Sequence, residues 1–267
     1  MASNNLLRVM TYNIRFDTAQ DGHNQWRNRK DRVIQLIEKY KPDLFGVQEA
    51  VAHQMNDLQT GLSDYRAYGV GRDDGRTRGE FSPVFYRHDR FELKDQGTFW
   101  LSETPDKPGS KGWDAVLPRI CSWVRLKDRL SDKELCFFNT HFDHIGRNAR
   151  QQSANLILTR IQQIAGQQTP VILTGDFNTG PQSAAYQTVV TDTIMQDAKS
   201  ITESEHQGPD GTWSTFDVQC KIGDRIDYIF IKIGHFIVSK HEHLTDSDGK
   251  HYPSDHLPVR AELNYTN

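Results

Sequence analysis

Residues 171–178 read VILTGDFN, a short apolar run that stops abruptly at Asp176 and Asn178. A short apolar run with β-branched residues is typical of a buried strand. A carboxylate beside such a strand costs free energy unless it is paired or binds a metal. A single Asp or Asn at a strand end has a simpler explanation, because both residues commonly stabilise turns. The pattern therefore becomes informative only if it recurs along the chain.

The same pattern, a strand-like run with a polar side chain at or beside its end, recurs five more times. It occurs in LRVMTYN (7–13), DLFGVQE (43–49), LCFFNTH (135–141) and RIDYIFI (225–231), and in SDH (254–256) before LPVRAEL (257–263). Six independent turn-capping explanations are improbable when they are taken jointly. The polar ends therefore indicate a common functional constellation.

Helical segments separate several of these strands. The apolar spacing predicts helices over 24–40 and 53–62, and a long amphipathic helix marked by residues 154–165. Further strands are predicted at 65–70, 83–86, 119–126 and 236–239. The glycine-rich segment 69–80 is expected to be a mobile surface loop, and 102–117 a second irregular loop. Strands joined both through helices and directly favour a layered α/β fold with two packed sheets.

The bulk composition excludes several classes of protein. The 267 residues carry 32 basic and 35 acidic side chains, a net charge of −3, and no long run of like charge. A basic stripe for gripping duplex nucleic acid is therefore not expected. The three cysteines lack CxxC spacing, which argues against a disulfide framework or a thiolate zinc site. With no repeat, linker or low-complexity tract, we expect one domain over 1–267.

The apolar runs are too short to span a bilayer. The first residues, MASNNLLRVM, lack the charged and apolar regions of a signal peptide. The sequence as given therefore favours a cytoplasmic location. An exported protein would require a signal peptide that had already been removed.

The polar strand ends form an oxygen-rich set without cysteine. Its members are Asn13, Glu49, Asp176, Asn178, Asp227 and Asp255. Such a set suits a hard cation, Mg²⁺ or alternatively Mn²⁺, rather than zinc. Mg²⁺ needs only one or two protein carboxylates, which leaves the others free to act as a base or to orient a partner. His256 alone would be an ordinary turn histidine, but next to Asp255 it is a candidate for phosphate binding or proton transfer.

With these residues in this order, the chain resembles the endonuclease/exonuclease/phosphatase superfamily, the deoxyribonuclease I-like metal-dependent phosphoesterases. The matching motifs are TYNIR (11–15), GVQEA (46–50), NTHFDH (139–144), GDFN (175–178), RIDYIF (225–230) and SDHLPV (254–259). Each motif is weak alone, whereas six in the family's order are specific. The resemblance implies a four-layer sandwich of two packed mixed β-sheets flanked by helices, with a cleft at one end of the sheets.

The resemblance also implies a metal side of the site. Glu49 would be the main Mg²⁺ ligand, and Asn13 would help to hold metal-bound water or phosphate. Asp255 would hold a second metal or a metal-bound water. One or two metal ions are both compatible with these motifs.

On the catalytic side, the resemblance implies that Asp176 polarises the attacking water and that Asn178 holds that water or a phosphate oxygen. His256 would contact the scissile phosphate and would be oriented by Asp227. No motif decides whether Asp176 or His256 is the general base. We expect in-line attack of water on phosphorus without a covalent enzyme intermediate.

Other candidates are supported by fewer observations. His141 and His144 would contact phosphate oxygens or the leaving group, although relatives vary at this motif. Arg119 could clamp a phosphate with two hydrogen bonds or form a surface ion pair. The basic residues of the first helix, Arg29 among them, are expected to form a solvated face.

Three functions remain open from the sequence. The first is a phosphatase or phosphodiesterase for a small or lipid-linked phosphate ester, which the near-neutral charge favours. The second is a nuclease acting on RNA or DNA, which should show a basic groove and salt-sensitive binding. The third is a non-catalytic binding module on the same fold, which is disfavoured because Glu49, Asp176 and His256 are all present.

Overall fold

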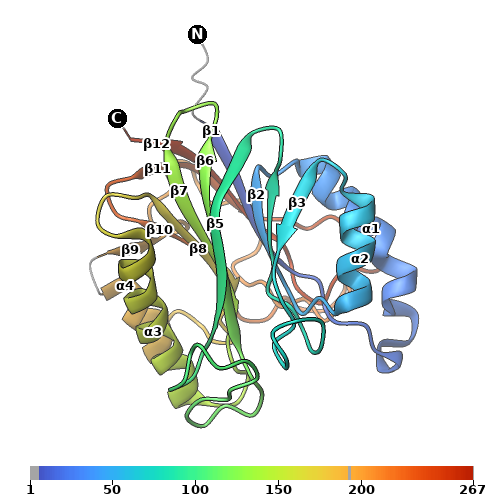
Figure 1. Cartoon of the computed structure of the whole chain (residues 1–267). Coiled ribbons are helices and arrows are strands. Elements are labelled where there is room, and N and C mark those ends of the chain that lie inside the picture. The colour runs from blue at the N-terminus through green and yellow to red at the C-terminus, as the bar shows by residue number, and fades with distance from the viewer. Residues whose placement is uncertain (1–5, 192–193, 267) are drawn as a thin grey trace.

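The structure is a computed structural model that describes residues 6–191 and 194–266. Two six-stranded mixed sheets pack against each other, and helices cover their outer faces (Figure 1). The predicted four-layer α/β sandwich is therefore confirmed. Within the described residues, no helix is long and apolar enough to cross a membrane.

The first sheet has the strand order β11-β12-β1-β2-β4-β3. Its strands are β11 (Phe236–His243), β12 (Val259–Tyr265), β1 (Leu6–Asn13), β2 (Leu44–Gln48), β4 (Val84–Arg87) and β3 (Tyr65–Tyr68). The β1–β2 pair is parallel and places Asn13 opposite Gln48. A 3₁₀ turn (Ala19–Asn24) leads into α1 (Trp26–Tyr40), and α2 (Ala52–Gly61) lies beside α1 on the same side of the sheet (Figure 1).

The second sheet has the order β5-β6-β7-β8-β10-β9. Its strands are β5 (Phe91–Trp100), β6 (Ile120–Asp128), β7 (Glu134–His141), β8 (Val171–Asp176), β10 (Asp227–Lys232) and β9 (Met195–Asp197). The β7–β8 pair is parallel, so the carboxyl ends of both strands lie at one edge. The helices α3 (Arg147–Ala165) and α4 (Ala184–Thr191) cover the outer face (Figure 1).

Three apolar clusters hold the four layers together. One contains residues of both sheets, such as Val9 of β1 and Phe137 of β7, and is the core between the sheets. A second joins the second sheet to α3, with Ile157 and Phe230 among its members. A third joins the first sheet to α1 and α2. The apolar faces predicted from periodicity therefore point into these layers.

Strands at the centre of the sheets were easier to predict than those at the edges. The sequence analysis missed β5, α4 and β9. β5 is an edge strand whose residues 92–96 are exposed, so it lacks the apolar run of a buried strand.

Two segments that were predicted to be exposed contain buried arginines. Arg72, within the predicted surface loop, is buried and pairs with Glu80 across a hydrogen-bonded turn.

The prediction of a solvated face for the first helix is wrong at Arg29. This side chain is only 1% exposed. It donates to the backbone oxygens of Ile14 and Arg15, and at 3.3 Å to that of Pro253. A guanidinium has five N–H donors in a fixed geometry, so one arginine can satisfy several carbonyl oxygens at once. Arg29 therefore ties the segment after β1 to the segment before His256.

A buried polar network lies between the sheets behind the strand ends. Asn139 of β7 donates to the carbonyl oxygens of Val47 (2.7 Å) and Pro83 (2.8 Å) and accepts from Gln48 at 2.6 Å. A Cβ atom at Gly46 would lie 2.2 Å from Asn139 Oδ1 and 2.5 Å from Thr174 Oγ1. Gly46 is thus required by close packing of the two sheets rather than by an unusual backbone conformation.

We expect Gly46→Ala to lower the free energy of unfolding by about 3 kcal/mol, near the upper end for overpacking of a core. Urea unfolding followed by circular dichroism measures this change. The matched control is Gly180→Ala, because a Cβ there has no atom within 4 Å. Equal stability of the two variants would contradict the packing argument.

Candidate active site

The polar residues predicted at the ends of strands meet at one end of the two sheets. In the second sheet, His141 of β7 and Asp227 of β10 are both register partners of Asp176 on β8. In the first sheet, Asn13 ends β1, and Glu49 directly follows β2. The sheet register therefore places side chains from five chain segments next to one another, although Asn13 and Asp227 are 214 residues apart in sequence.

Asn13 connects the two sheets at this edge. Its Nδ2 donates to Glu49 Oε1 at 3.0 Å and to Asp176 Oδ2 at 2.9 Å. Its Oδ1 accepts from the backbone N–H of Arg15 at 3.0 Å, which determines the orientation of the amide. The amide therefore presents its donor group to both carboxylates, and its oxygen is engaged with the backbone.

Glu49 is held in an unusual backbone conformation. Its φ is +67°, in the left-handed region, which costs a non-glycine residue about 1–3 kcal/mol and is found mainly at functional sites. Its Oε2 accepts from the backbone N–H of Phe16 at 3.1 Å. Burial opposes ionisation, but the charge of His256 and the hydrogen bonds from Asn13 and Phe16 outweigh it, so the pKa of Glu49 lies below its usual 4.5. Glu49 therefore remains anionic at the mouth of the site.

Asp176 lies at the centre of the site and is only 1% exposed. Its Oδ1 accepts from the backbone N–H of Asn178 at 2.8 Å, and its Oδ2 lies 3.5 Å from His141 Nε2 and 3.9 Å from His256 Nε2. Burial, followed by the charge of Asp227, raises the pKa of Asp176 to about 7. A carboxyl with this pKa can bind and release a proton near neutral pH.

His256 and Asp227 form a buried pair beside Asp176. His256 Nδ1 donates to Asp227 Oδ2 at 2.8 Å. The same oxygen accepts from Thr212 Oγ1 at 2.6 Å. Burial lowers the pKa of His256, but the charges of Asp227 and Asp176 outweigh it and hold that pKa well above the usual 6.5. The ring is therefore a cation whose Nε2 points toward Asp176.

His141 has the opposite electrostatic character. Its Nε2 accepts from Asn178 Nδ2 at 2.9 Å, so its proton is on Nδ1, which lies 3.7 Å from Glu80 Oε2. Burial and then the charges of Arg119 and Arg72 hold the pKa of His141 well below 6.5. Asn178, with a left-handed φ of +50°, is also held by the backbone oxygen of Phe142 at 3.0 Å. The site thus contains one charged and one neutral histidine.

A basic side of the site is formed by Arg119 and Arg72. Arg119 is 3% exposed, so the surface ion pair considered for it is not what the structure shows. Its Nη2 donates to Nδ1 of the exposed His144 at 3.1 Å. Within the described residues, Nε and Nη1 of Arg119 and Nε of Arg72 are buried without a hydrogen-bond partner. Arg119 Nε is 3.7 Å from Asp143 Oδ2 and Arg72 Nε is 3.9 Å from Asp73 Oδ1, in ion pairs that are too long for hydrogen bonds. Three cationic donors without a hydrogen bond are suited to an anionic ligand.

Two residues of this site were missed by the sequence analysis as functional candidates. They are Glu80, whose pKa burial and Glu49 raise to about 7, and Thr212, which holds Asp227. Neither ends an apolar run, and both lie in irregular segments. No local pattern in the sequence could have identified them.

Asp255 lies on the opposite side of the site from the two buried arginines, next to Arg15. Its Oδ2 is 3.9 Å from Arg15 Nε, and Arg15 is in turn paired with Asp21 at 3.1 Å. Burial and the charge of Glu49 raise the pKa of Asp255 against the attraction of His256 and Arg15. Its ionisation is therefore not fully compensated by the surrounding protein.

The donor set fits a divalent cation. Glu49, His141 and Asp176 each offer a ligand atom within 4.8 Å of the others. Burial, and after it the charge of a neighbouring carboxylate, raises the pKa values of Asp176, Asp255 and Glu80. Oxygen donors in this number favour a hard cation such as Mg²⁺ or Mn²⁺. A cation bound there would supply the missing charge.

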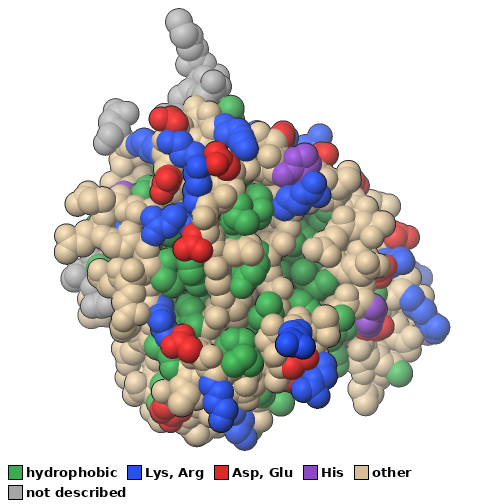
Figure 2. All heavy atoms as spheres, in the orientation of Figure 1, with side chains coloured by type: hydrophobic (Ala, Val, Ile, Leu, Met, Phe, Trp, Pro, Cys, Tyr) green, Lys and Arg blue, Asp and Glu red, His purple; other side chains and the backbone are tan. Residues whose placement is uncertain are grey.

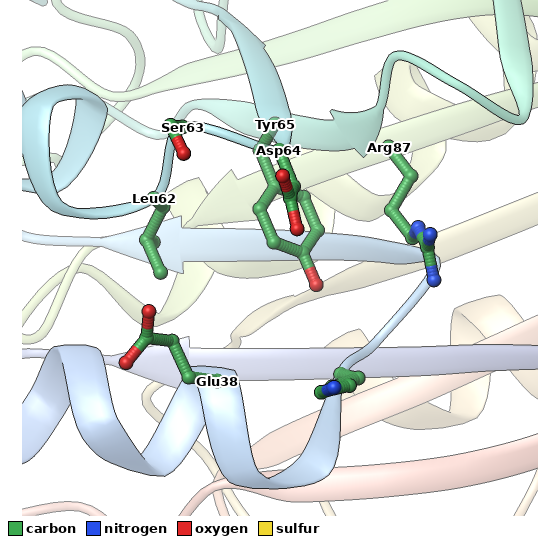
Figure 3. Close-up of a pocket in the computed structure, with 7 residues that line it drawn as sticks. Glu38, Leu62, Ser63, Asp64, Tyr65 and Arg87 are labelled. Atoms are coloured by element: carbon green, nitrogen blue, oxygen red, sulfur yellow. The ribbon is translucent and has the colours of Figure 1, made fainter.

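A separate pocket lies far from this constellation. It has a volume of about 170 Å³ and lies between the end of α1 and the start of β3, near Tyr65 and Arg87 (Figure 3). Register pairs Arg87 with Tyr65 and Tyr86 with Leu44 at the start of β2, so the pocket is at the sheet edge opposite to Glu49. It contains none of the motif residues, and we do not place the reaction there.

The distribution of charged side chains on the surface bears on nucleic-acid binding. On the face shown in Figure 2, Lys and Arg side chains are interspersed with Asp and Glu, and no continuous basic band crosses it. This distribution agrees with the net charge of −3. The face therefore offers no extended track for a phosphate backbone.

Comparisons with known proteins agree with this geometry. The sequence model of a family described as "Endonuclease/Exonuclease/phosphatase family" matches residues 10–256. A structure of a protein of that family from Bacteroides vulgatus is 42% identical, with a TM-score of 0.91, and the match covers 98% of this chain and 99% of that one. The structure of a mannosyl-6-phosphatase from Bacteroides thetaiotaomicron is 39% identical, with a TM-score of 0.91 and coverage of 96% and 99%.

Relatives found by sequence alone are more distant. An uncharacterized protein of Acanthamoeba polyphaga mimivirus is 30% identical over 182 residues, 65% of this chain and 67% of the viral protein. The chain spans about half the length of another curated relative.

Proposed function

Because this chain belongs to the endonuclease/exonuclease/phosphatase family, we propose that it is a Mg²⁺-dependent phosphatase acting on small phosphomonoesters, with sugar phosphates as the favoured substrates. The observation that carries the proposal is the buried pair Arg72 and Arg119. Three of their guanidinium nitrogens have no hydrogen-bond partner among the described residues, although Arg119 Nε and Arg72 Nε each form a long ion pair with a carboxylate. A phosphomonoester offers three non-bridging oxygens and up to two charges, whereas a diester offers two oxygens and one charge.

The size of the substrate is inferred from the surroundings of the site. The similar mannosyl-6-phosphatase acts on a phosphate ester of a sugar, by its name. Trp213 is 46% exposed and pairs through its backbone with His256, so its ring is available beside the site for an apolar face of a sugar. A long nucleic-acid strand would need a basic track, and the face in Figure 2 offers none.

In the proposed reaction, Asp176 orients a water molecule and takes its proton. The water oxygen forms a bond to phosphorus in line with the departing alcohol, and the P–O bond to that alcohol breaks with its electron pair on the leaving oxygen. A proton then binds to this leaving oxygen, so the products are an alcohol and inorganic phosphate. The raised pKa of Asp176, about 7, makes this carboxylate a stronger base than an ordinary Asp.

His256 is assigned a different role from Asp176. Its ring stays protonated beside Asp227 and Asp176, so it cannot accept the water proton and instead donates a hydrogen bond to a phosphate oxygen. Asp227 and Thr212 orient the ring. This division leaves Asp176 as the base, which the motifs alone did not decide.

Several side chains position the substrate. Arg72 and Arg119 bind phosphate oxygens, and Asn178 holds the water or an oxygen. His144, exposed and held by Arg119, lies where it can contact the leaving group. Glu49 would hold the cation together with Asp255, and Asn13 would orient Glu49 and Asp176. The bound cation would withdraw charge from the phosphate and assist attack by water.

The first experiment is hydrolysis of a panel in Mg²⁺ and in EDTA. The panel holds two hexose 6-phosphates, an inositol phosphate, a bis-aryl phosphodiester, sphingomyelin, and single-stranded RNA and DNA. We expect metal-dependent release of phosphate from the hexose phosphates with the highest kcat/KM. Preferential cleavage of RNA or DNA would replace the proposal with the nuclease alternative. Absence of any turnover by a folded protein would contradict the proposed phosphatase activity.

Arg119→Lys should raise KM for the monoester by about 10–100-fold, since one charge-assisted hydrogen bond contributes about 1.5–3 kcal/mol. The charge is kept, but the planar pair of donors is lost. Turnover of the bis-aryl diester should change less. The matched control is Arg76→Lys, at an exposed arginine in the loop that carries Arg72. Equal losses on monoester and diester would argue against a monoester clamp.

A further inference from the structure

Three histidines form a second cluster outside the proposed active site. His241 and His243 are two residues apart on β11, so their side chains share one face of the strand. His206 comes from the irregular segment between β9 and β10. The ring centroids are 4.5, 5.0 and 5.4 Å apart, and each ring offers one nitrogen within 4.8 Å of the other two. The oxygen-rich site contains none of these residues.

The hydrogen bonds of His243 identify its free lone pair. Its Nδ1 lies 2.7 Å from the carbonyl oxygen of Pro209 and 3.1 Å from that of Gly211. Carbonyl oxygens only accept, so Nδ1 must carry the proton. The lone pair is then on Nε2, which is buried and has no hydrogen-bond partner among the described residues. His243 as a whole is only 2% exposed.

His206 and His241 contribute the rest of the cluster. His206 Nδ1 lies 3.0 Å from His241 Nδ1 and 3.2 Å from the His241 carbonyl oxygen, while His206 Nε2 lies 3.2 Å from the Pro209 carbonyl oxygen. A neutral ring has one N–H and cannot donate to both carbonyls. With its proton on Nε2, His206 donates to Pro209 and directs the Nδ1 lone pair toward His241.

We propose that His206, His241 and His243 form a binding site for a divalent transition-metal ion, Zn²⁺ foremost, with His206 Nδ1, His241 Nδ1 and His243 Nε2 as ligands and a fourth position open to water. Tetrahedral zinc with Zn–N bonds of about 2.0–2.1 Å places its ligand nitrogens about 3.4 Å apart. The Nδ1–Nδ1 distance of 3.0 Å is close to that spacing.

The groups behind the rings resemble those of a metal site. Metal-binding histidines nearly always donate their other N–H to a carbonyl or carboxylate, which orients the ring. Here the carbonyl oxygen of Pro209 accepts from both His206 and His243. The all-nitrogen ligand set selects zinc, copper or nickel rather than Mg²⁺. The second site therefore differs in metal preference from the oxygen-rich site.

The cationic side chains near the cluster are themselves paired. Lys199 and Arg225 lie close enough to influence these rings electrostatically. Each is paired with a carboxylate, Lys199 with Asp210 at 3.0 Å and Arg225 with Asp197 at 2.7 Å.

A bound ion would attach the segment between β9 and β10 to β11. Two backbone hydrogen bonds already join them, from Gln207 N to His241 O (3.2 Å) and from His243 N to Gln207 O (2.9 Å). The same segment carries Thr212, which holds Asp227 in the active site. The second metal is thus expected to act as a structural ion that stabilises this segment.

Zn²⁺ binding should be measured on chelator-treated protein that carries Glu49→Gln, which weakens the oxygen-rich site. We expect one Zn²⁺ per chain after dialysis, a rise in the thermal midpoint, and visible absorption of tetrahedral Co²⁺ when cobalt replaces zinc. In the same background, His206→Ala should weaken binding at least 100-fold and abolish the cobalt bands. His206 is partly exposed, so its loss is compatible with folding.

Two further variants complete the test. His243→Gln should also lose the ion, and exposed His88→Ala should keep it. Stoichiometric Zn²⁺ that survives both His206→Ala and His243→Gln would place the ion elsewhere. No Zn²⁺ binding in the Glu49→Gln background would show that the cluster is only a hydrogen-bonded group of neutral rings. Either result would overturn the proposal without affecting the proposed phosphatase activity.

Discussion

Asp176→Asn is expected to lower kcat by about 10³-fold or more, which is within the range for the loss of a general base. The substitution keeps the shape of the side chain and the contact with the backbone N–H of Asn178 but removes the atom that would accept the water proton. KM should change little, because Arg72 and Arg119 rather than Asp176 are assigned to bind the phosphate. Steady-state kinetics in saturating Mg²⁺ measure both quantities.

The same variant should gain stability relative to the wild type as the pH rises, when metal is removed. The folded-state pKa of about 7 lies above the ordinary 3.8, so the folded protein holds this proton more tightly than the unfolded chain does. The stabilisation linked to that proton is present below about pH 4 and is lost as the pH rises through 7. Asn cannot lose a proton, but it does lose the hydrogen bond from Asn13 at every pH. In EDTA, the urea midpoint of Asp176→Asn relative to that of the wild type should therefore rise between pH 5 and pH 8.

Exposed Asp95→Asn provides the control for Asp176→Asn, since it removes one carboxylate outside the site. Its kinetics and urea midpoint should match those of the wild type. A folded Asp176→Asn enzyme with wild-type turnover would remove Asp176 from the mechanism and return the role of base to His256.

Glu49→Gln is expected to raise the Mg²⁺ concentration for half-maximal activity by about 100-fold or more. Loss of even an outer-shell partner commonly costs 10–100-fold in metal affinity, and Glu49 is proposed to contact the ion directly. Gln has a single acceptor oxygen, so it keeps the hydrogen bond from either the Phe16 N–H or Asn13 Nδ2 but not both, while the size of the side chain is unchanged. Isothermal titration with Mg²⁺ gives a readout that does not depend on turnover.

Exposed Glu134→Gln is the matched control for Glu49→Gln and should leave the Mg²⁺ dependence unchanged. Partial recovery of the Glu49→Gln rate at high Mg²⁺ is expected, because Asp255 remains. Unchanged Mg²⁺ affinity in Glu49→Gln would move the main ligand role to another carboxylate of the cluster.

The sequence alone determined the layered fold and most of the residues that meet at the sheet edge. Central strands such as β1 and β8 are apolar runs that end on Asn13 and Asp176, a pattern confined to a few consecutive residues. Secondary-structure propensity and hydrophobic periodicity are properties of a few consecutive residues. Such strands can therefore be predicted from the sequence alone. β5 was missed because an edge strand is solvated and shares the composition of a loop.

Tertiary structure alone decided the electrostatics of the site and its irregular contributors. The sequence predicts that Arg29 is a solvated helical residue, yet the fold buries it against the carbonyls of Ile14 and Pro253. Burial, and then the charge of Asp227 that β10 places opposite it, raises the pKa of Asp176, and both arise only in the folded protein. Likewise, His206 meets His241 and His243 only through a segment without regular structure. These properties depend on distances between residues remote in sequence, which sheet register and loop closure establish and which no local pattern encodes.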